Sequence, residues 1–231
     1  MKTPVPFEPK NLGPGVNTEN PEYFPAITGD DQMLMYTRVI PDARIPENMG
    51  GRQEDFFVSE WENEKWGEGY SISNQINSQF NEGAPTLSAD GRVMIFTACE
   101  LPEMGYGDRR KGKGSCDLFY TFKQGDNWTL PGNFGDPINT WHWETQPSFS
   151  SDGRTLYFVR GIREPRSQRD PQKQDIYFSN YSDDKGWSVP QKLSDKINTP
   201  YREESVYIHP DGQTLYFSSN GHPGMGGLDI Y

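Results

Sequence analysis

One phrase occurs four times along the chain at nearly constant spacing, and this repetition constrains the fold more than any other feature. In each copy, a turn that contains aspartate separates two runs of alternating apolar residues. Asp-Gly between such runs is a strong hairpin signal, because glycine tolerates the positive φ that a tight turn requires. We therefore expect a two-residue turn and two antiparallel strands in every copy. The turn aspartates, spaced by 60, 62 and 59 residues, are Asp30, Asp90, Asp152 and Asp211.

Other residues keep a fixed distance from each turn. An asparagine lies thirteen residues before the turn aspartate and a glutamate lies eight residues before it. The asparagines are Asn17, Asn77, Asn139 and Asn198, and the glutamates are Glu22, Glu82, Glu144 and Glu203. A second aspartate opens an aromatic strand after each turn, at Asp55, Asp117, Asp175 and Asp229. The repeat is therefore a unit of about 60 residues rather than a local turn motif.

Each unit contains enough strand signals for one blade of a β-propeller. The aromatic run supplies a third strand, and the segment from Trp66, Trp128 or Trp187 to the next asparagine supplies a fourth. Pro131 and Pro190 fit an outer edge strand, where a missing N–H breaks no ladder bond. Such blades must stack around an axis, with aromatic side chains between them. The fold expected is all-β, a propeller of four-stranded antiparallel blades.

The strand count places three whole blades and one split blade in the chain. The single propeller domain 1–231 divides into an outer strand of the split blade, three blades, and the first three strands of the split blade, at 1–20, 21–80, 81–142, 143–201 and 202–231. Two architectures fit this count: a closed ring of four blades, or a fragment of a larger propeller. We favour the fragment. Long loops rich in Gly, Pro and basic residues are expected at 97–116 and 159–174.

Cys99 ends one strand of its blade and Cys116 precedes the next, so both can lie at the base of the same loop. A disulfide there is plausible and would stabilise the fold by about 3 kcal/mol in an oxidising compartment. Two buried free thiols are the alternative.

The amino-acid composition limits the classes of partner that the chain is expected to bind. The chain has 33 acidic and 22 basic residues, a net charge of −11, which disfavours binding to nucleic acid. Its mean hydropathy is −0.87, and no run approaches the roughly 20 apolar residues that span a bilayer. A basic cluster could contact an anion, although solvated charge is the ordinary outcome for such a loop; it comprises Arg109, Arg110, Lys111 and Lys113. Neither a zinc spacing nor a calcium loop is present, so we predict no metal and no cofactor.

The chain resembles the TolB-type propeller repeats of OmpA-family envelope proteins of the Bacteroidetes, including the peptidoglycan-associated lipoproteins of type IX secretion and gliding. The resemblance covers nearly the whole chain. It rests on the opening Pro9-Lys-Asn-Leu-Gly-Pro-Gly-Val-Asn-Thr-Glu19, on Gly114-Ser-Cys-Asp-Leu-Phe-Tyr120 with Cys99, and on Gln213 to Tyr231. It implies a periplasmic, outer-membrane-associated interaction platform, with peptidoglycan bound by a separate domain that this sequence does not contain.

The residues favour binding over catalysis. The three histidines are poorly placed for a reactive set, although His142, between Trp141 and Trp143, and His222 could contact a ligand from loops. The four glutamates enter the innermost strands, so they could line the axial mouth and bind a cation or the basic end of a peptide. The alternative is that each caps backbone N–H groups of an adjacent blade. The asparagines are expected to tie loop backbone together.

The competing function is a glycosidase. The Ser-x-Asp-Gly phrases at 88–91 and 150–153 look like the Asp-box of sialidases. In sialidases that box follows the third strand, whereas here it joins the first two. We therefore expect a non-catalytic envelope module that binds a protein, peptide or glycan partner.

Overall fold

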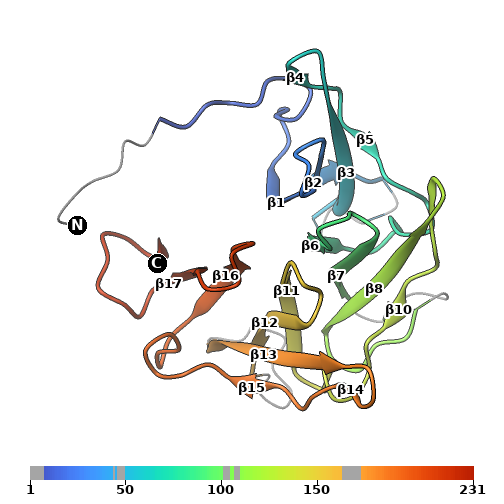
Figure 1. Cartoon of the computed structure of the whole chain (residues 1–231). Helices are drawn as coiled ribbons and strands as arrows, with labels where there is room; N and C mark the ends of the chain where they lie inside the picture. The colour runs from blue at the N-terminus through green and yellow to red at the C-terminus, as the bar shows by residue number, and fades with distance from the viewer. Residues whose placement is uncertain (1–7, 44, 46–49, 101–104, 107–109, 163–172) are drawn as a thin grey trace.

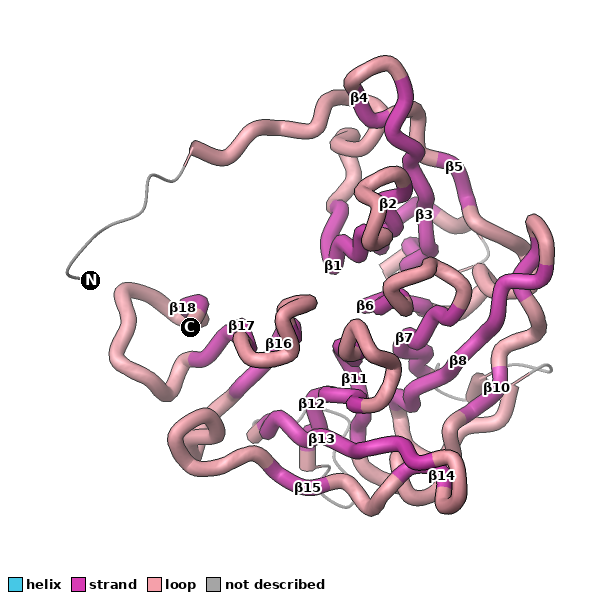
Figure 2. The backbone as a smooth tube through the Cα atoms, viewed as in Figure 1, coloured by secondary structure: helices cyan, strands magenta, loops and turns pink. Residues whose placement is uncertain are grey.

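The computed structural model describes residues 8–43, 45, 50–100, 105–106, 110–162 and 173–231. Every regular element in these ranges is a β-strand, and the strands form four blades arranged as an open arc around a central axis (Figures 1 and 2). The expected all-β propeller fold is confirmed.

The first two blades contain five strands each. Blade 1 consists of β1 (Glu22–Ile27), β2 (Met33–Pro41), β3 (Arg52–Glu62), β4 (Lys65–Trp66) and β5 (Tyr70–Ser71). Blade 2 consists of β6 (Glu82–Leu87), β7 (Val93–Cys99), β8 (Cys116–Gln124), β9 (Asn127–Trp128) and β10 (Gly132–Asn133).

Blade 3 repeats this pattern and blade 4 is shorter. Blade 3 consists of β11 (Trp143–Phe149), β12 (Thr155–Gly161), β13 (Gln174–Ser182), β14 (Gly186–Trp187) and β15 (Gln191–Lys192). Blade 4 consists of β16 (Glu203–Ile208), β17 (Leu215–Ser219) and β18 (Asp229–Ile230). Within residues 8–20 the chain forms turns but no strand, so the outer strand expected in 1–20 is not seen there; residues 1–7 lie outside the described part.

The outer strand of each complete blade is divided into two short pieces. β9 and β10 both pair with β8, and β14 and β15 both pair with β13. Pro131 and Pro190 lie in the gaps between these pieces. Proline lacks the N–H that a continuous ladder needs, which interrupts the expected fourth strand in blades 2 and 3. In blade 1, where β4 and β5 both pair with β3, the gap is Gly67 to Gly69 and contains no proline.

The turn between the first two strands is longer than expected. The backbone N–H of Ser88 donates to the carbonyl of Val93, which leaves the four residues 89–92 in the loop. Gly91 has φ of +66°, and Asp31 adopts +57° at the same position in the first copy. The prediction of a two-residue turn was therefore wrong. The turn aspartate stabilises the longer loop: Oδ1 of Asp90 accepts from the Ser88 hydroxyl at 2.6 Å and from the Arg92 N–H at 3.1 Å.

The hydrophobic core lies between the blades. Phe56 of blade 1 packs edge-on against Phe96 of blade 2, with ring centroids 5.3 Å apart, and both are fully buried. A second cluster joins Leu118 to Phe158 of blade 3, and a third joins Ile176 to Phe217 of blade 4. Each aromatic or aliphatic side chain of this size contributes about 1.5–3 kcal/mol on full burial. Stacking of the blades, as expected, buries the faces that single blades leave exposed.

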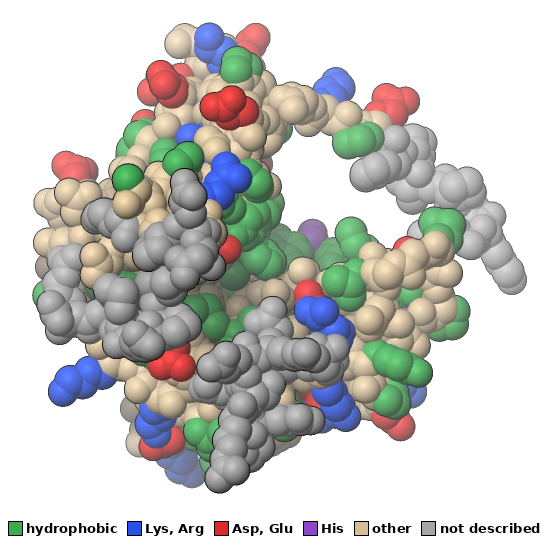
Figure 3. Space-filling view, turned by 180° about the vertical axis from the view of Figure 1, so that it is seen from behind, with side chains coloured by type: hydrophobic (Ala, Val, Ile, Leu, Met, Phe, Trp, Pro, Cys, Tyr) green, Lys and Arg blue, Asp and Glu red, His purple; other side chains and the backbone are tan. Residues whose placement is uncertain are grey.

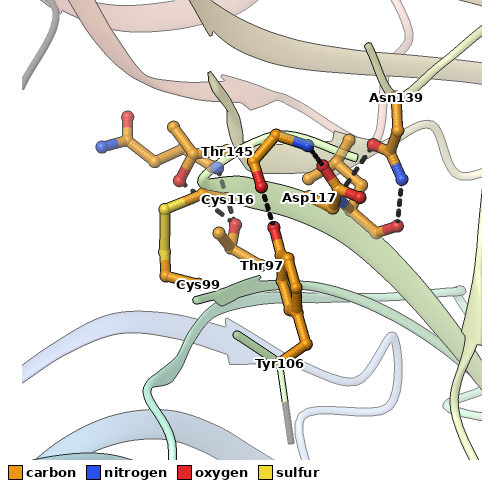
Figure 4. Close-up of a disulfide and its surroundings, with 10 residues drawn as sticks. Thr97, Cys99, Tyr106, Cys116, Asp117, Asn139 and Thr145 are labelled. Carbon is orange, nitrogen blue, oxygen red and sulfur yellow. Dashed lines mark hydrogen bonds between the residues drawn. A yellow bond between two sulfur atoms is a disulfide. The ribbon is translucent and has the colours of Figure 1, made fainter. Parts of the chain in front are cut away.

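Cys99 and Cys116 form a disulfide (Figure 4). They are directly opposite each other where β7 pairs with β8. The hydroxyls of Thr97 and Thr145 meet nearby at 3.2 Å and link blade 2 to blade 3. The bond therefore closes the loop between β7 and β8 next to the junction of two blades.

Reduction of this disulfide should lower the free energy of unfolding by about 3 kcal/mol, because it releases a loop with a sequence separation of 17. Urea unfolding of the oxidised protein with and without dithiothreitol measures the effect. The double variant Cys99→Ser/Cys116→Ser is the control, since dithiothreitol should not change its midpoint. Equal midpoints for the oxidised and reduced wild-type protein would contradict the prediction.

Candidate functional site

The four repeated glutamates are hydrogen-bonded to the loop that enters their own strand, and all but Glu22 are fully buried. Glu82, Glu144 and Glu203 have no exposed surface. The carboxylate of Glu144 accepts from the backbone N–H of Thr140 at 3.0 Å and from its hydroxyl at 2.6 Å. The same two donors, four residues before the glutamate, are Thr18, Ser78 and Thr199 in the other blades. Each glutamate thus fixes the linker between two blades.

An arginine completes this arrangement in three blades. Arg160 donates from Nε to Glu144 at 2.7 Å and from Nη2 to the carbonyl of Ile138 at 2.8 Å. Arg38 makes the same pair of bonds to Glu22 and to the carbonyl of Val16. In blade 2 the guanidinium comes from the loop instead: Arg110 bonds Glu82 and the carbonyl of Ile76.

The guanidiniums lie between two aromatic rings. Cζ of Arg160 is 5.4 Å from the ring centre of Phe158 and 4.8 Å from that of Tyr177. The corresponding rings are Tyr36 and Phe57 around Arg38, and Phe96 and Phe119 around Arg110. This geometry adds cation–π attraction to the buried ion pair.

Blade 4 fills the same place without an arginine. The hydroxyl of Ser219 donates to Glu203 at 2.8 Å, and Nε2 of His222 donates to the carbonyl of Ile197 at 2.8 Å. The imidazole lies between Phe217 and Tyr231, at centroid distances of 5.8 and 5.1 Å. His222 is half-buried and therefore has a structural position, and its contact with a ligand stays a prediction.

None of the four glutamates lines the axial cavity, so the prediction that Glu22, Glu82, Glu144 and Glu203 line its mouth was wrong. Their carboxylates are hydrogen-bonded to the linkers instead, as the burial of a charged group requires. Their role is the structural alternative, with the linker rather than the adjacent blade as the partner. Arg110, in the basic cluster, is buried against Glu82, whereas Lys113 pairs with Asp136 at the surface and Arg109 lies outside the described residues.

Three of the four asparagines join the linker to the third strand of the preceding blade, whereas Asn17 accepts from the N–H of Leu12 in its own segment. Oδ1 of Asn139 accepts from the N–H of Leu118 at 2.9 Å, and Nδ2 donates to the carbonyl of the same residue at 2.8 Å. Asn77 bonds both backbone groups of Phe56, and Asn198 bonds both groups of Ile176. The amide thus ties backbone together as expected.

A cavity of about 870 Å³ lies on the axis between the innermost strands of all four blades. Its wall is mostly apolar, and Gln146, Ser148 and Ser205 are among its polar residues. Among the described residues, no charged side chain lines it. Figure 3 shows apolar side chains gathered in the hollow between the blades. This cavity is the candidate site, since ligand pockets of this size are typically apolar with a few polar groups.

Every innermost strand bends where it meets this cavity. A register shift follows the second paired residue of β1, β6 and β16 and the third of β11. The bulged residues Phe24, Ala84, Gln146 and Ser205 have φ between 49° and 53°, and each lines the cavity. Bulges and positive φ in non-glycine residues occur often at functional sites. The sequence signal for them, a proline that follows the bulged residue at Pro25, Pro85 and Pro147, was missed.

The aromatic cluster before β11 lies away from the cavity. Trp141 is 54% exposed and its ring centre is 4.0 Å from that of His142. Burial, with the nearby Arg160, lowers the pKa of His142 below its usual value. Trp143 begins β11 and pairs with Cys116. Trp141, His142 and Trp143 are therefore separate from the axial site, and Trp141 is the more exposed of the two indoles.

The described residues contain no cluster of three or more His, Cys, Asp or Glu side chains suited to a metal. They also include no helix that is long and apolar enough to cross a membrane.

Comparison with solved structures supports the fold. TolB from Acinetobacter baumannii superimposes with a TM-score of 0.52 at 14% identity, over 94% of this chain and 41% of that chain. Putative TolB from Agrobacterium tumefaciens gives 0.48 at 14% identity, over 78% and 51%. The tricorn protease gives 0.49 at 7% identity, over 84% and 20%. The chain thus spans about half or less of these proteins. No family model and no curated protein sequence matches it. At this identity the likeness to TolB shows a shared propeller fold.

Arg160→Ala should lower the free energy of unfolding by about 3–5 kcal/mol, because Glu144 would remain buried without its cation. Chemical denaturation measures the loss. Arg154→Ala is the matched control: Arg154 pairs with Asp183 at the exposed surface, so its loss should leave the midpoint unchanged. Equal effects of the two substitutions would contradict the structural role of the buried pair.

Burial raises the pKa of Glu82 from 4.5 to about 7, against the opposing effects of Arg110 and Ser78. The folded state then binds more protons than the unfolded state between these values. Stability from this group is therefore greatest below pH 4.5 and falls by about 3 kcal/mol as the pH rises through 7. Urea unfolding from pH 4.5 to 8 should show a shallower decline for Glu82→Gln than for wild type. If the stability of wild type and of Glu82→Gln declined in parallel with pH, the raised pKa of Glu82 would be contradicted.

Proposed function

We propose that this chain is a non-catalytic binding module of an exported cell-envelope protein, and that its axial cavity holds an uncharged, apolar segment of a protein or peptide partner. The observation that carries the proposal is the wall of the cavity, which the innermost strands of all four blades build with no charged side chain among the residues that the structure describes. A charged ligand would lose its hydration there without gaining a partner. An apolar segment would lose only unfavourable contact with water.

The cavity also offers directional polar groups. Gln146 reaches across the junction of blades 3 and 4, where its Oε1 accepts from the N–H of Ser205 at 2.6 Å. The Ser148 hydroxyl accepts from the N–H of Ile208 at 2.9 Å. These bonds hold the bulged strands in place, so the wall is preorganised and a ligand need not order it. Preorganisation reduces the cost of binding.

The disulfide supports export. Disulfides persist in oxidising compartments such as the periplasm and the cell surface, and are rare in the cytosol. Cys99 and Cys116 are bonded, and the described residues contain no other cysteine. An envelope location agrees with the resemblance to OmpA-family propeller repeats. Nucleic acid remains an unlikely partner for a chain of net charge −11.

The competing glycosidase function has less support. Glycoside hydrolysis generally needs two carboxyl groups that flank the scissile bond. No carboxyl group of the described part of the chain lines the axial cavity, and the turn aspartates are engaged in their own loops, as Asp152 is with Ser150 and Arg154. We therefore assign no reaction to the site.

Binding of capped heptapeptides, measured by fluorescence polarisation, tests the proposal. Matched sets of uncharged apolar, acidic and basic peptides should give binders only in the apolar set. Ile27→Asp places a carboxylate on the cavity wall at a half-exposed residue and should weaken binding at least tenfold. Val189→Asp, at a 74% exposed residue of the outer edge, is the control and should bind as wild type.

Three outcomes would overturn the proposal. If only the basic peptides bound, the site would be negatively charged, as the sequence-based interpretation of the glutamates expected, and not the apolar cavity. Equal binding by Ile27→Asp and wild type would place the ligand outside the cavity. Turnover of a sialoside or peptide substrate at an enzyme-like rate would exclude a non-catalytic role.

A further inference from the structure

A second cavity lies at the junction of blades 1 and 2, and we call it the junction cavity. Its volume is about 510 Å³, and it shares no lining residue with the axial cavity. The linker between β5 and β6 lines it, together with Tyr106 and Arg110 of the loop that the disulfide closes and with Leu130 and Pro131 of the outer edge of blade 2. It is therefore a separate candidate site for a small ligand.

Blades 2 and 3 place a long side chain where blade 1 has this cavity. Nδ2 of Asn133 donates to Asp117 at 2.7 Å, and Nζ of Lys192 lies 2.7 Å from Asp175. Asn133 and Lys192 are both on the outer strand, opposite the residue two positions after the aspartate that they contact. The residue at this position of blade 1 is Ser71. Because serine is shorter than asparagine or lysine, it leaves space beside the aspartate of blade 1.

The wall of the junction cavity is rich in amide side chains, which both donate and accept hydrogen bonds. Asn74 and Gln75 of the linker stand where the next two linkers carry Asp-Pro at 136–137 and Asp-Lys at 195–196. Gln75 and Gln79 are exposed. The amide residues that line the cavity are Gln53, Asn74, Gln75, Asn77 and Gln79.

The charged residues of the cavity do not favour an ionic ligand. Among the described residues that line it, Asp55 and Arg110 are charged. The guanidinium of Arg110 is already paired with the buried Glu82, so it has little attraction left for an anion. Asp55 accepts from Nε2 of Gln53 at 3.0 Å and is only 6% exposed, so a cation that reached it would lose most of its hydration. A carboxylate accepts several hydrogen bonds, so Asp55 suits the hydroxyl of a neutral ligand.

We propose that the junction cavity binds an uncharged sugar of a glycan. The hydroxyls at the edge of a pyranose ring both donate and accept, which matches the amide side chains and Asp55. The C–H face of the ring packs against Leu130 and Pro131. Leu130 is 63% exposed, so this packing removes apolar surface from water.

A polar peptide is the less suitable occupant of the junction cavity. Extended peptides bind mainly through the open backbone groups of a strand edge. At Ile72, next to Ser71, the backbone N–H is already bonded to the carbonyl of Phe56. The hydrogen-bonding groups of the cavity are chiefly side chains, and a sugar is recognised in this way.

Isothermal titration calorimetry with defined oligosaccharides tests the proposal. The neutral probes are maltopentaose, cellopentaose and chitopentaose, and the acidic probes are sialyllactose and trigalacturonic acid. A capped, uncharged heptapeptide of Ser, Asn and Gly is the peptide probe. We expect at least one neutral saccharide to bind at millimolar concentration, and we expect no binding of the acidic saccharides or of the peptide.

Ser71→Lys tests the location of the site. It copies the lysine that blade 3 carries at the same position, so the new side chain should pair with Asp55, fill the cavity and keep the fold. We expect the affinity for the neutral saccharide to fall at least tenfold. Gln191→Lys is the matched control, because it adds the same charge at an exposed residue of blade 3 outside the cavity. It should bind as wild type.

A second variant does not introduce a charge. Gln75→Ala/Gln79→Ala removes two exposed amides and should weaken binding about tenfold, the value of two neutral hydrogen bonds. The Tm of each variant, measured by circular dichroism, checks that the protein is folded.

Several results would overturn the proposal. If no neutral saccharide bound the wild-type protein, the glycan would be excluded as the ligand. Tighter binding of an acidic saccharide or of the peptide would assign the cavity to another class of ligand. Equal affinity of Ser71→Lys and wild type would place the sugar outside the junction cavity. Ile27→Asp, in the axial cavity, should leave saccharide binding unchanged, so the two sites are tested separately; a loss of saccharide binding in this variant would place the sugar on the axis.

Discussion

The structure depends on one interaction that recurs at every junction: a buried glutamate at the start of the innermost strand. Its carboxylate binds the backbone N–H and hydroxyl of the residue four positions earlier. A guanidinium then joins the same carboxylate to the carbonyl of the linker. A buried charge is tolerated only when it is paired. Movement of the linker would break the hydrogen bonds to the carboxylate and leave a buried, unpaired charge, which is strongly destabilising. This fixes the angle at which each blade leaves the previous one.

The uncharged character of the axial cavity is consistent with this placement of the charged side chains. The four glutamates and the three arginines that bind Glu22, Glu82 and Glu144 lie away from the axial wall, whose described residues are apolar or neutral polar. The bulges at Phe24, Ala84, Gln146 and Ser205 then turn the innermost strands at the level of the cavity. A scaffold that uses its charges for stability thus presents an uncharged surface for binding.

The four blades also show how one interaction can be made from different residues. Arg38 and Arg160 come from the second strand, whereas Arg110 comes from the loop that the disulfide closes. In blade 4, Ser219 donates to the glutamate and His222 donates to the linker carbonyl, which are the two contacts that one arginine makes in the other blades. The aromatic rings on either side are retained in all four, so the site for the cation is set by the sheet and only its occupant varies.

The sequence by itself determined the repeat, the all-β class and the stacked blades, because the period of the apolar residues and the turn residues are local signals. It also indicated Cys99 and Cys116 as a pair, since neighbouring strand ends bring them together. It did not determine where Glu22, Glu82, Glu144 and Glu203 point. A glutamate on an innermost strand can face the axis or the linker, and the choice depends on a partner 16 or 28 residues away, which is an arginine in three blades and Ser219 in blade 4. Only the tertiary structure decided that these carboxylates are buried, that His222 replaces a guanidinium and that the axis is uncharged, because each depends on contacts between segments distant in the chain.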